Sequence, residues 1–151
     1  MVSAVGLSPN LAKVQATQDW RIPGSVTDFC SFLGLAGYYR RFISQFARIV
    51  APLTNLTRKD HPFAWTLREG EAFQNLKDAL IKAPILQLAD PSKEFIVTTD
   101  ASDFAVGAVL SQVWDDGEHP VAYKSRKMNA VEVIYATHER ELLAVIHALR
   151  T

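Results

Sequence analysis

The pattern of apolar positions changes its period near Pro91. Before that residue, apolar side chains recur every three or four positions, as Phe29, Phe32 and Ala36 do, which is typical of amphipathic helices. After it, the runs "EFIVTTD" and "AVGAVLSQVW" are short, apolar and rich in β-branched residues, which favours strands. The sequence therefore predicts a helical part followed by a part that contains a sheet.

Two helix starts can be read in the helical part. Ser25 followed by Asp28, and Thr66 followed by Glu69, have the spacing of a capping box. The first helix is expected to break at Gly37, before a further helical stretch. The inner face of the helix after Thr66 is expected to consist of Ala72, Phe73, Leu76, Ala79 and Leu80. Residues 1–20 show no strong pattern.

The later part predicts a three-stranded antiparallel meander. An Asp-Gly turn in "DDGEH" separates the second strand from a third strand in "PVAYKS". Strong helix formers then fill "THERELLAVIHALR". The expected fold class is α+β, with a small helical segment followed by the meander and one helix.

Composition excludes several classes of protein. An apolar share of 48% in 151 residues is ordinary for a globular chain. No apolar run approaches the roughly 20 residues of a membrane helix, and no signal pattern opens the chain, so no membrane partner is expected. The single cysteine, Cys30, cannot form an internal disulfide, and we expect it to be a buried, small apolar residue. This composition favours an intracellular location, in the cytoplasm, the nucleus or both.

The net charge of the whole chain is zero, but the helical part is net basic and the later part is net acidic. Residues 1–90 contain 10 basic and 7 acidic side chains, whereas residues 91–151 contain 6 basic and 9 acidic ones. A basic part beside an acidic part can hold a polyanion near a cation-binding site. Two ordinary solvated surfaces explain the same counts, and charge alone favours that simpler interpretation.

Asp100 ends the first predicted strand, where an aspartate is uncommon. It shares one face of that strand with Ile96 and Thr98. One interpretation is that Asp100 caps the turn into the next strand through backbone amides, a role that Asp103 also fits. The other is that the strand delivers a functional carboxylate.

The last helix supplies a possible second carboxylate. Glu139 and Glu141 both have apolar helical neighbours, so the helical wheel does not choose between them. If Thr137 is the N-cap, Glu139 lies in the first turn, where the helix dipole favours an acid. Two converging carboxylates repel unless they are protonated or bridged by a cation, and hard oxygen ligands suit Mg²⁺ or Mn²⁺. Such ions can activate water for phosphodiester hydrolysis.

Several ordered motifs together resemble one family. "SFLGLAGYYRRFI", "APLTNL", "PFAWT", "EAFQNLKDAL", "TDASDFAVGAVLSQ", "PVAYKSRKMN" and "YATHERELLAVIHAL" resemble the Pol polyprotein of gypsy-type LTR retrotransposons, in the order of that family. The resemblance implies that residues 1–20 are the tail of a reverse-transcriptase palm. Residues 21–90 would then be helical thumb and connection, and residues 91–151 a partial ribonuclease H-like domain.

The resemblance also implies a site and its partners. Asp100 in "TDAS" matches the first metal-binding carboxylate of the family, and Glu141 in "ELLAVIHAL" matches the second, so Glu141 is selected over Glu139. The expected ligand is an RNA/DNA hybrid, whose RNA strand the family hydrolyses with Mg²⁺ or Mn²⁺. Two further family carboxylates would lie beyond Thr151, so we expect weak metal binding and little or no cleavage by this chain alone.

The resemblance also predicts an open sheet edge. In the family fold the first strand also pairs with a strand that would lie beyond Thr151, so here its edge would be apolar and exposed. A homodimer through that edge, or contact with the remainder of a polyprotein, is therefore expected. Polymerase activity is not expected, because no Tyr-x-Asp-Asp motif is present and Asp115 and Asp116 lie in a hairpin turn.

Basic and aromatic residues are candidates for contact with the hybrid. They are Tyr38, Tyr39, Arg40, Arg41, Arg48, Lys124, Arg126 and Lys127. The simpler interpretation is that the tyrosines belong to the core and the arginines to a solvated surface. An alternative function for the whole chain is a non-catalytic module that binds nucleic acid or protein, as a retroelement remnant would.

Overall fold

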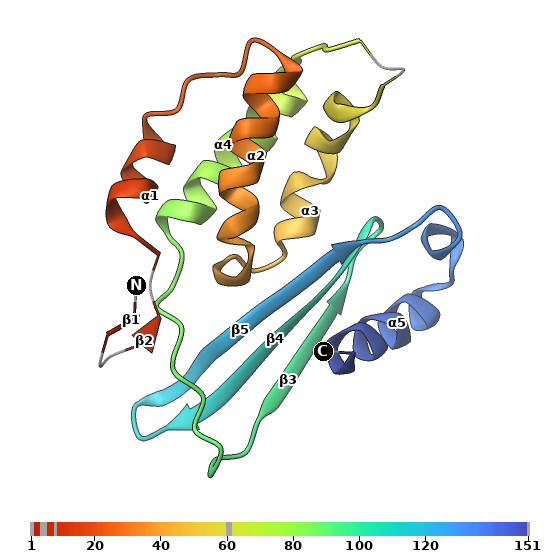
Figure 1. Ribbon diagram of the computed structural model, residues 1–151. Coiled ribbons are helices and arrows are strands. Elements are labelled where there is room, and N and C mark those ends of the chain that lie inside the picture. The colour runs from red at the N-terminus through yellow and green to blue at the C-terminus, as the bar shows by residue number, and fades with distance from the viewer. Residues whose placement is uncertain (1, 4–5, 8, 60–61, 151) are drawn as a thin grey trace.

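The chain builds a layer of helices against one face of a small sheet, and its last helix covers the other face (Figure 1). The computed structural model describes residues 2–3, 6–7, 9–59 and 62–150. The α-helices are α1 (Leu11–Gln18), α2 (Val26–Tyr38), α3 (Phe46–Val50), α4 (Leu67–Ile81) and α5 (Thr137–Leu149). Short 3₁₀ segments are η1 (Arg40–Phe42), η2 (Ala51–Thr57) and η3 (Glu132–Ile134). The strands are β1 (Val2–Ser3), β2 (Gly6–Leu7), β3 (Ile96–Ala101), β4 (Ala105–Trp114) and β5 (Gly117–Lys127).

The predicted α+β fold is confirmed. Strands β3, β4 and β5 form an antiparallel sheet in that order, with a register shift between Leu110 and Ser111. The hairpin between β4 and β5 turns at Asp115 and Asp116, as the Asp-Gly motif predicts. In the described part of the chain β3 pairs only with β4, so β3 is an edge strand.

The helical layer has an aromatic core. The phenyl rings of Phe32 and Phe73 lie 4.5 Å apart between centroids and join α2 to α4. Trp20 packs edge-on against Phe32 at 5.6 Å, and Trp65 packs against Phe73 at 5.5 Å. The side chain of Lys77 is also buried here. Its Nζ donates a hydrogen bond of 2.9 Å to the carbonyl of Trp20, which compensates for the loss of contact with water. The inner faces predicted for α2 and α4 therefore lie in the core.

The helices differ in detail from what the sequence indicates. Gly37 lies in the last turn of α2, which ends at Tyr38, and helical structure resumes in η1 and α3. Cys30 is exposed, because neighbouring Phe29 defines the buried side of α2. Residues 1–20 contain α1, which begins where Asn10 Oδ1 accepts a hydrogen bond from the amide of Ala12. The N-cap of α5 is Ala136, one residue before Thr137.

Side chains of β3 and β4 alternate between the two faces of the sheet. Ala101 and Val106 pack with Ala144 of α5 in a small apolar cluster. Asp100 and its partner Gly107 point to the opposite face, where α3 lies. Figure 1 shows the same arrangement, with α3 and α5 on either side of the sheet.

Polar contacts fasten the helical layer to the sheet. Ser125 Oγ accepts from the amide of Ala47 at 3.0 Å, and its carbonyl accepts from Arg40 Nη2 at 3.1 Å. Gln112 is fully buried and bonds the backbone of Asp90 in both directions, which holds the strand-like connection after α4 against β4. In the ranges described above, no helix is long and apolar enough to cross a membrane.

Candidate nucleic-acid interface and carboxylate site

Asp100 lies near the end of β3, directly opposite Gly107 of β4. Its side chain is exposed, and its Oδ2 accepts a hydrogen bond of 2.6 Å from Nε2 of Gln45. Gln45 in turn accepts at Oε1 a hydrogen bond of 3.1 Å from Nη1 of Arg48. The carboxylate on the sheet is therefore joined through an amide to a cation on α3.

Glu141 lies on α5, and its side chain is exposed. The buried side of that helix is formed by other residues, among them Ala144, which packs toward β4. Because Asp100 projects toward α3, it leaves the sheet on the face opposite to the one that α5 covers. The structure thus brings Asp100 together with Gln45 and Arg48.

Glu139 caps the start of α5. Its Oε2 accepts from the backbone amide of Ala136 at 2.8 Å, and it lies in the first turn of α5. That contact satisfies one of the unpaired amides of a helix start. Glu139 is therefore explained by helix capping, whereas Glu141 has no such structural role.

The donor set suits a weakly held hard cation. Asp100 and Glu141 supply exposed carboxylate oxygens, which are ligands that Mg²⁺ prefers. Within the described ranges no group of three or more His, Cys, Asp or Glu side chains lies close enough to hold a metal ion. Each of these carboxylates can therefore supply a ligand to a cation, but neither is part of a larger ligand group among the described residues.

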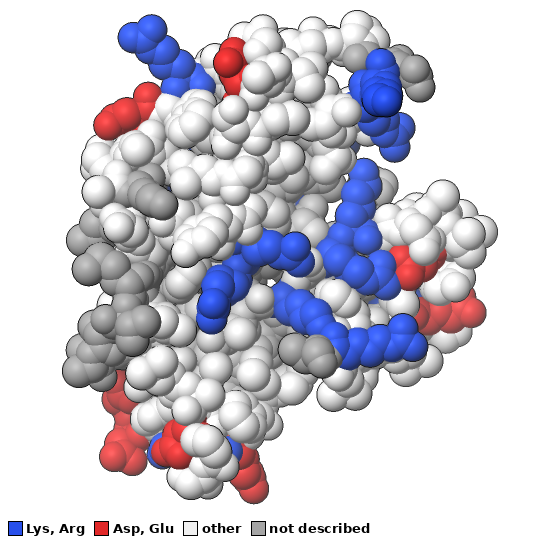
Figure 2. Space-filling model, in the orientation of Figure 1, with Lys and Arg blue, Asp and Glu red and all other residues white. Residues whose placement is uncertain are grey.

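A groove with cationic walls runs between α3, η2 and α4 and reaches the tip of the sheet. One hollow of about 430 Å³ and another of about 380 Å³ share Arg48, Pro52 and Arg68 in their linings. Lys127 closes the end nearest the sheet, next to the half-exposed ring of Phe104. We call this feature the basic groove. Figure 2 shows Lys and Arg side chains gathered in the middle of the molecule, where the helical layer meets the sheet.

The predicted contacts on the helical layer have different surroundings. Tyr39 is 3% exposed and belongs to the core, whereas Tyr38 is 71% exposed and stands edge-on to it at 5.1 Å. Arg40 is bonded to the carbonyl of Ser125. Arg41 lies over the ring of Phe42, 5.7 Å from its centroid. Tyr38, Arg40 and Arg41 are thus exposed, and of these Arg40 is also held to the sheet through Ser125.

Lys124 and Lys127 on β5 also make contacts within the chain. Nζ of Lys124 donates to the carbonyls of His147 and Arg150, near the C-terminal end of α5, where the helix dipole favours a cation. Nζ of Lys127 donates to the hydroxyl of Thr54 at 2.9 Å and remains in the lining of the basic groove. Lys127 thus lines the basic groove, whereas Lys124 is held at the end of α5.

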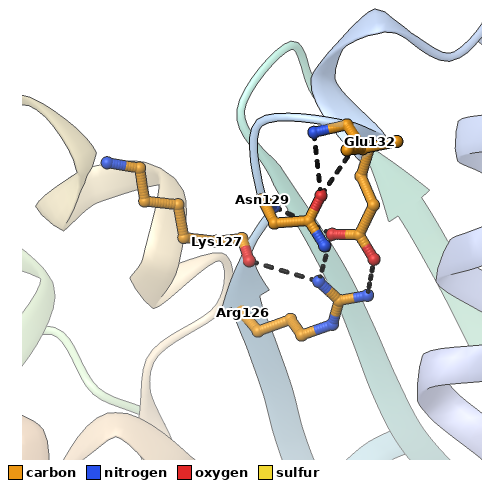
Figure 3. Close-up of polar contacts among 5 residues, drawn as sticks. Arg126, Lys127, Asn129 and Glu132 are labelled. Carbon is orange, nitrogen blue, oxygen red and sulfur yellow. Dashed lines mark hydrogen bonds and ion pairs between the residues drawn. The ribbon is translucent and has the colours of Figure 1, made fainter.

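Arg126 is held by a two-point ion pair. Its Nη1 and Nη2 lie 2.7 and 2.8 Å from the carboxylate oxygens of Glu132, which also accepts from the amide of Asn129 (Figure 3). These bonds hold the pKa of Glu132 at about 2 and raise the pKa of Arg126. The charge of Arg126 is therefore largely neutralised by a neighbour.

Comparison with known proteins decides the family. A model of the RNase H-like domain found in reverse transcriptase matches residues 65–151. The chain belongs to this family. The resemblance to retrotransposon Pol proteins is thereby confirmed, and the sheet with α5 is part of an RNase H-like domain.

Similar curated proteins are retroelement polyproteins. The Retrovirus-related Pol polyprotein from transposon 297 of Drosophila melanogaster is 43% identical over 152 residues. The Transposon Tf2-3 polyprotein of Schizosaccharomyces pombe is 37% identical over 150 residues. The alignments cover 100% and 99% of this chain, which spans 14% and 11% of those polyproteins.

Solved structures share the fold. A foamy viral protease-reverse transcriptase in complex with double-stranded DNA matches 95% of this chain and 25% of its own, with a TM-score of 0.78 and 25% identity. The same kind of protein in complex with an RNA/DNA hybrid matches 98% of this chain and 20% of its own, with a TM-score of 0.80 and 23% identity. The RNase H-like chain thus has the fold of a reverse-transcriptase segment.

Sequence reasoning missed two residues of the site in this RNase H-like chain. Gln45 gave no signal, because a glutamine next to Ser44 looks like any exposed polar residue. Arg68 lies in the first turn of α4, where a basic residue is unfavourable for the helix dipole, and that mismatch could have drawn attention to it.

Proposed function

We propose that this chain is a reverse-transcriptase/ribonuclease H segment that binds an RNA/DNA hybrid along the basic groove. The observation that carries the proposal is that Arg48 and Arg68 line both hollows of the basic groove and that Lys127 lines the one next to the sheet. Arg48 is also linked through Gln45 to the carboxylate of Asp100. A phosphate backbone in the groove would therefore lie beside a carboxylate that can bind a cation.

The chemistry of the groove fits a polyanion better than a small apolar ligand. Its walls carry guanidinium and ammonium groups together with the amides of Asn55 and Asn75, all of which can donate hydrogen bonds to phosphate oxygens. Such contacts bind the backbone of a nucleic acid without reading its sequence. Glu71 is the acid in the lining, and it would disfavour phosphate at the end of the groove nearest α4.

Asp100 is proposed to hold a divalent cation, and Glu141 is proposed as a second ligand because it matches the family motif. When bound, Mg²⁺ or Mn²⁺ would activate water and stabilise the leaving oxygen of a phosphodiester. The contribution of the chain itself is to present Asp100 on the face of the sheet where the basic groove lies. Glu141 is on α5, and its neighbour Arg140 lines a further hollow of about 300 Å³ together with Arg48.

The test is cleavage of a labelled RNA/DNA hybrid in Mg²⁺ and in Mn²⁺, by the chain and by its Asp100→Asn variant. Weak, metal-dependent cutting that the substitution abolishes, with binding retained, supports the assignment of Asp100. Cutting of equal rate in the variant contradicts it. Binding with no cutting at all would favour the alternative, a non-catalytic nucleic-acid-binding module.

An exposed apolar surface favours a protein partner in addition. The edge strand β3 and the segment before it expose Phe95, Ile96 and Val97, which are between 37% and 47% accessible. Helix α5, which packs against β3, exposes Leu142 and Leu149 at 60% and 71%. We propose that a second copy of this chain, or the remainder of a polyprotein, covers this surface. Light scattering that finds only monomers at high concentration would exclude the second copy.

A further inference from the structure

Gln45 combines an unfavourable backbone with an unusual side-chain contact. Among the described residues it is the one non-glycine residue with a positive φ, at φ 52° and ψ 32°. It is the N-cap of α3, yet its side chain makes no capping hydrogen bond. The side chain instead reaches across to β3 and donates to Asp100, 55 positions later in the chain. A backbone held in this region, next to a candidate site, points to a role there.

The hydrogen bonds leave only one orientation for the carboxamide of Gln45. Arg48 can only donate, so the amide oxygen must face its guanidinium. The amide nitrogen is then directed at Asp100, which as a carboxylate can only accept. Turning the amide over would place NH₂ against a cation and oxygen against an anion. Arg48 therefore fixes the amide, and the amide fixes the carboxylate.

We infer that Gln45 is a positioning residue for a divalent cation at Asp100. This inference rests on the proposed function, in which Asp100 is a cation ligand. A carboxylate has two oxygens and about four lone-pair sites, and Gln45 occupies one of them. Because the amide carries no net charge, it restrains the carboxylate without repelling a cation.

The carboxylate side chain would otherwise be loosely held. Asp100 is exposed and faces Gly107, which has no side chain that could restrict its rotation. Hydrogen bonds to metal ligands commonly raise metal affinity by 10- to 100-fold, because they fix the ligand before the metal arrives. Gln45 is placed to do this, and Arg48 holds Gln45 in turn.

A purely structural tie between α3 and the sheet is the alternative, and the chain provides a matched control. Gln74 Nε2 donates to Asp78 Oδ1 at 2.8 Å on the exposed face of α4. This pair has the same chemistry and lies in one helix, away from β3. Gln74→Ala therefore shows what the loss of an exposed glutamine–carboxylate bond does by itself.

The experiment is a titration of the ¹⁵N-labelled chain with Mn²⁺, observed as broadening of the backbone amide of Asp100. Variants are Gln45→Gly, which also relieves the positive φ, Arg48→Met, Gln74→Ala and Asp100→Asn. Thermal unfolding of each variant in a chelator measures stability separately. We expect Gln45→Gly to require at least tenfold more Mn²⁺, Arg48→Met to shift the titration in the same direction, and Gln74→Ala to match the parent chain.

The outcomes separate the inference from the proposed function. If Gln45→Gly changes only the unfolding temperature and leaves the Mn²⁺ titration unchanged, Gln45 is a structural tie and the inference is overturned. If Asp100→Asn leaves the broadening unchanged, Mn²⁺ does not bind at Asp100, and the inference and the cation site of the proposed function are both overturned. If Gln45→Gly requires more Mn²⁺ for the same broadening, and Asp100→Asn shows no broadening, the results support both the inference and the cation site of the proposed function.

Discussion

Arg126 and Glu132 face each other across the connection from β5 to α5, joined by two hydrogen bonds of 2.7 and 2.8 Å (Figure 3). The side chain of Glu132 is 13% exposed and that of Arg126 is 33% exposed, so water screens the pair only in part. Glu132 also accepts from the amide of Asn129. The pair thus fixes the loop from which α5 starts.

Acid is expected to weaken this loop. The pKa of Glu132 is about 2 in the folded chain, below its ordinary value of 4.5. As pH falls, the unfolded chain takes up this proton first, so the stability that Glu132 confers is complete above about pH 4.5 and is lost toward pH 2. Glu132→Gln should lower the free energy of unfolding at pH 7 by about 1–2 kcal/mol. Urea unfolding measures this.

An exposed pair provides the control. Asp116 and His119 form a similar contact at 2.9 Å, but Asp116 is 75% exposed. Asp116→Asn should therefore leave the unfolding midpoint almost unchanged. An equal fall in the free energy of unfolding for Glu132→Gln and Asp116→Asn would mean that the partial burial of Glu132 does not strengthen its ion pair.

His147 is expected to make the stability of the chain depend on pH at higher pH values than Glu132 does. Burial lowers the pKa of this imidazole, and nearby Lys124, Arg126 and Arg40 lower it further. The unfolded chain therefore binds the proton more readily, and stability present above about pH 6.5 declines as pH falls below that value. The urea midpoint should be lower at pH 5.5 than at pH 7.5. The difference should shrink in His147→Leu, and an equal difference in that variant would contradict the assignment.

Gly6 is expected to be intolerant of substitution. Its φ is 145°, and a Cβ atom at this position would lie 2.4 Å from the carbonyl oxygen of Leu86. Gly117 has a similar φ of 130° with no atom within 4 Å of the added Cβ. Gly117→Ala should cost about 1–3 kcal/mol from the backbone alone. Gly6→Ala should cost at least about 1 kcal/mol more because of the contact. If thermal unfolding shows the same loss of stability for both variants, the chain relieves the close contact between the added Cβ and Leu86 by a local shift.

Arg41 and Arg40 are expected to act differently, although they are neighbours in the sequence. Arg41 is exposed and stacks on Phe42, so Arg41→Ala should weaken hybrid binding and leave the melting temperature nearly unchanged. Arg40 bonds the carbonyl of Ser125, so Arg40→Ala should lower the melting temperature. Fluorescence anisotropy with a labelled hybrid, beside thermal unfolding, separates the two effects. Unchanged affinity in Arg41→Ala would remove that residue from the interface.

Much of the fold could be predicted from local pattern. The β4 run from Ala105 to Trp114 was readable because an apolar, β-branched segment ended at an Asp-Gly turn. The capping box at Thr66 marked the start of α4, and Glu69 accepts from its amide. In both cases neighbouring residues carry the whole signal.

The site could be predicted less well, because its contacts join distant parts of the chain. The partner of Asp100 is Gln45, and nothing in the sequence around either residue indicates the other. Strand alternation placed Asp100 on one face, but it did not tell which helix covers that face. Cys30 was misjudged for a related reason: a small residue in an apolar helix has no direction of its own until Phe29 sets the buried side.

The most direct test of the basic groove is the salt dependence of hybrid affinity in an Arg48→Ala, Arg68→Ala double variant. Each phosphate contact contributes a slope of roughly 0.9 to the fall of log K with log salt. Lys82→Ala is the control, because Lys82 caps the other end of α4 and is absent from the lining of the groove. We predict weaker binding and a slope shallower by about 1–2 in the double variant, with Lys82→Ala close to the parent chain. An unchanged slope in the double variant would contradict hybrid binding in the groove.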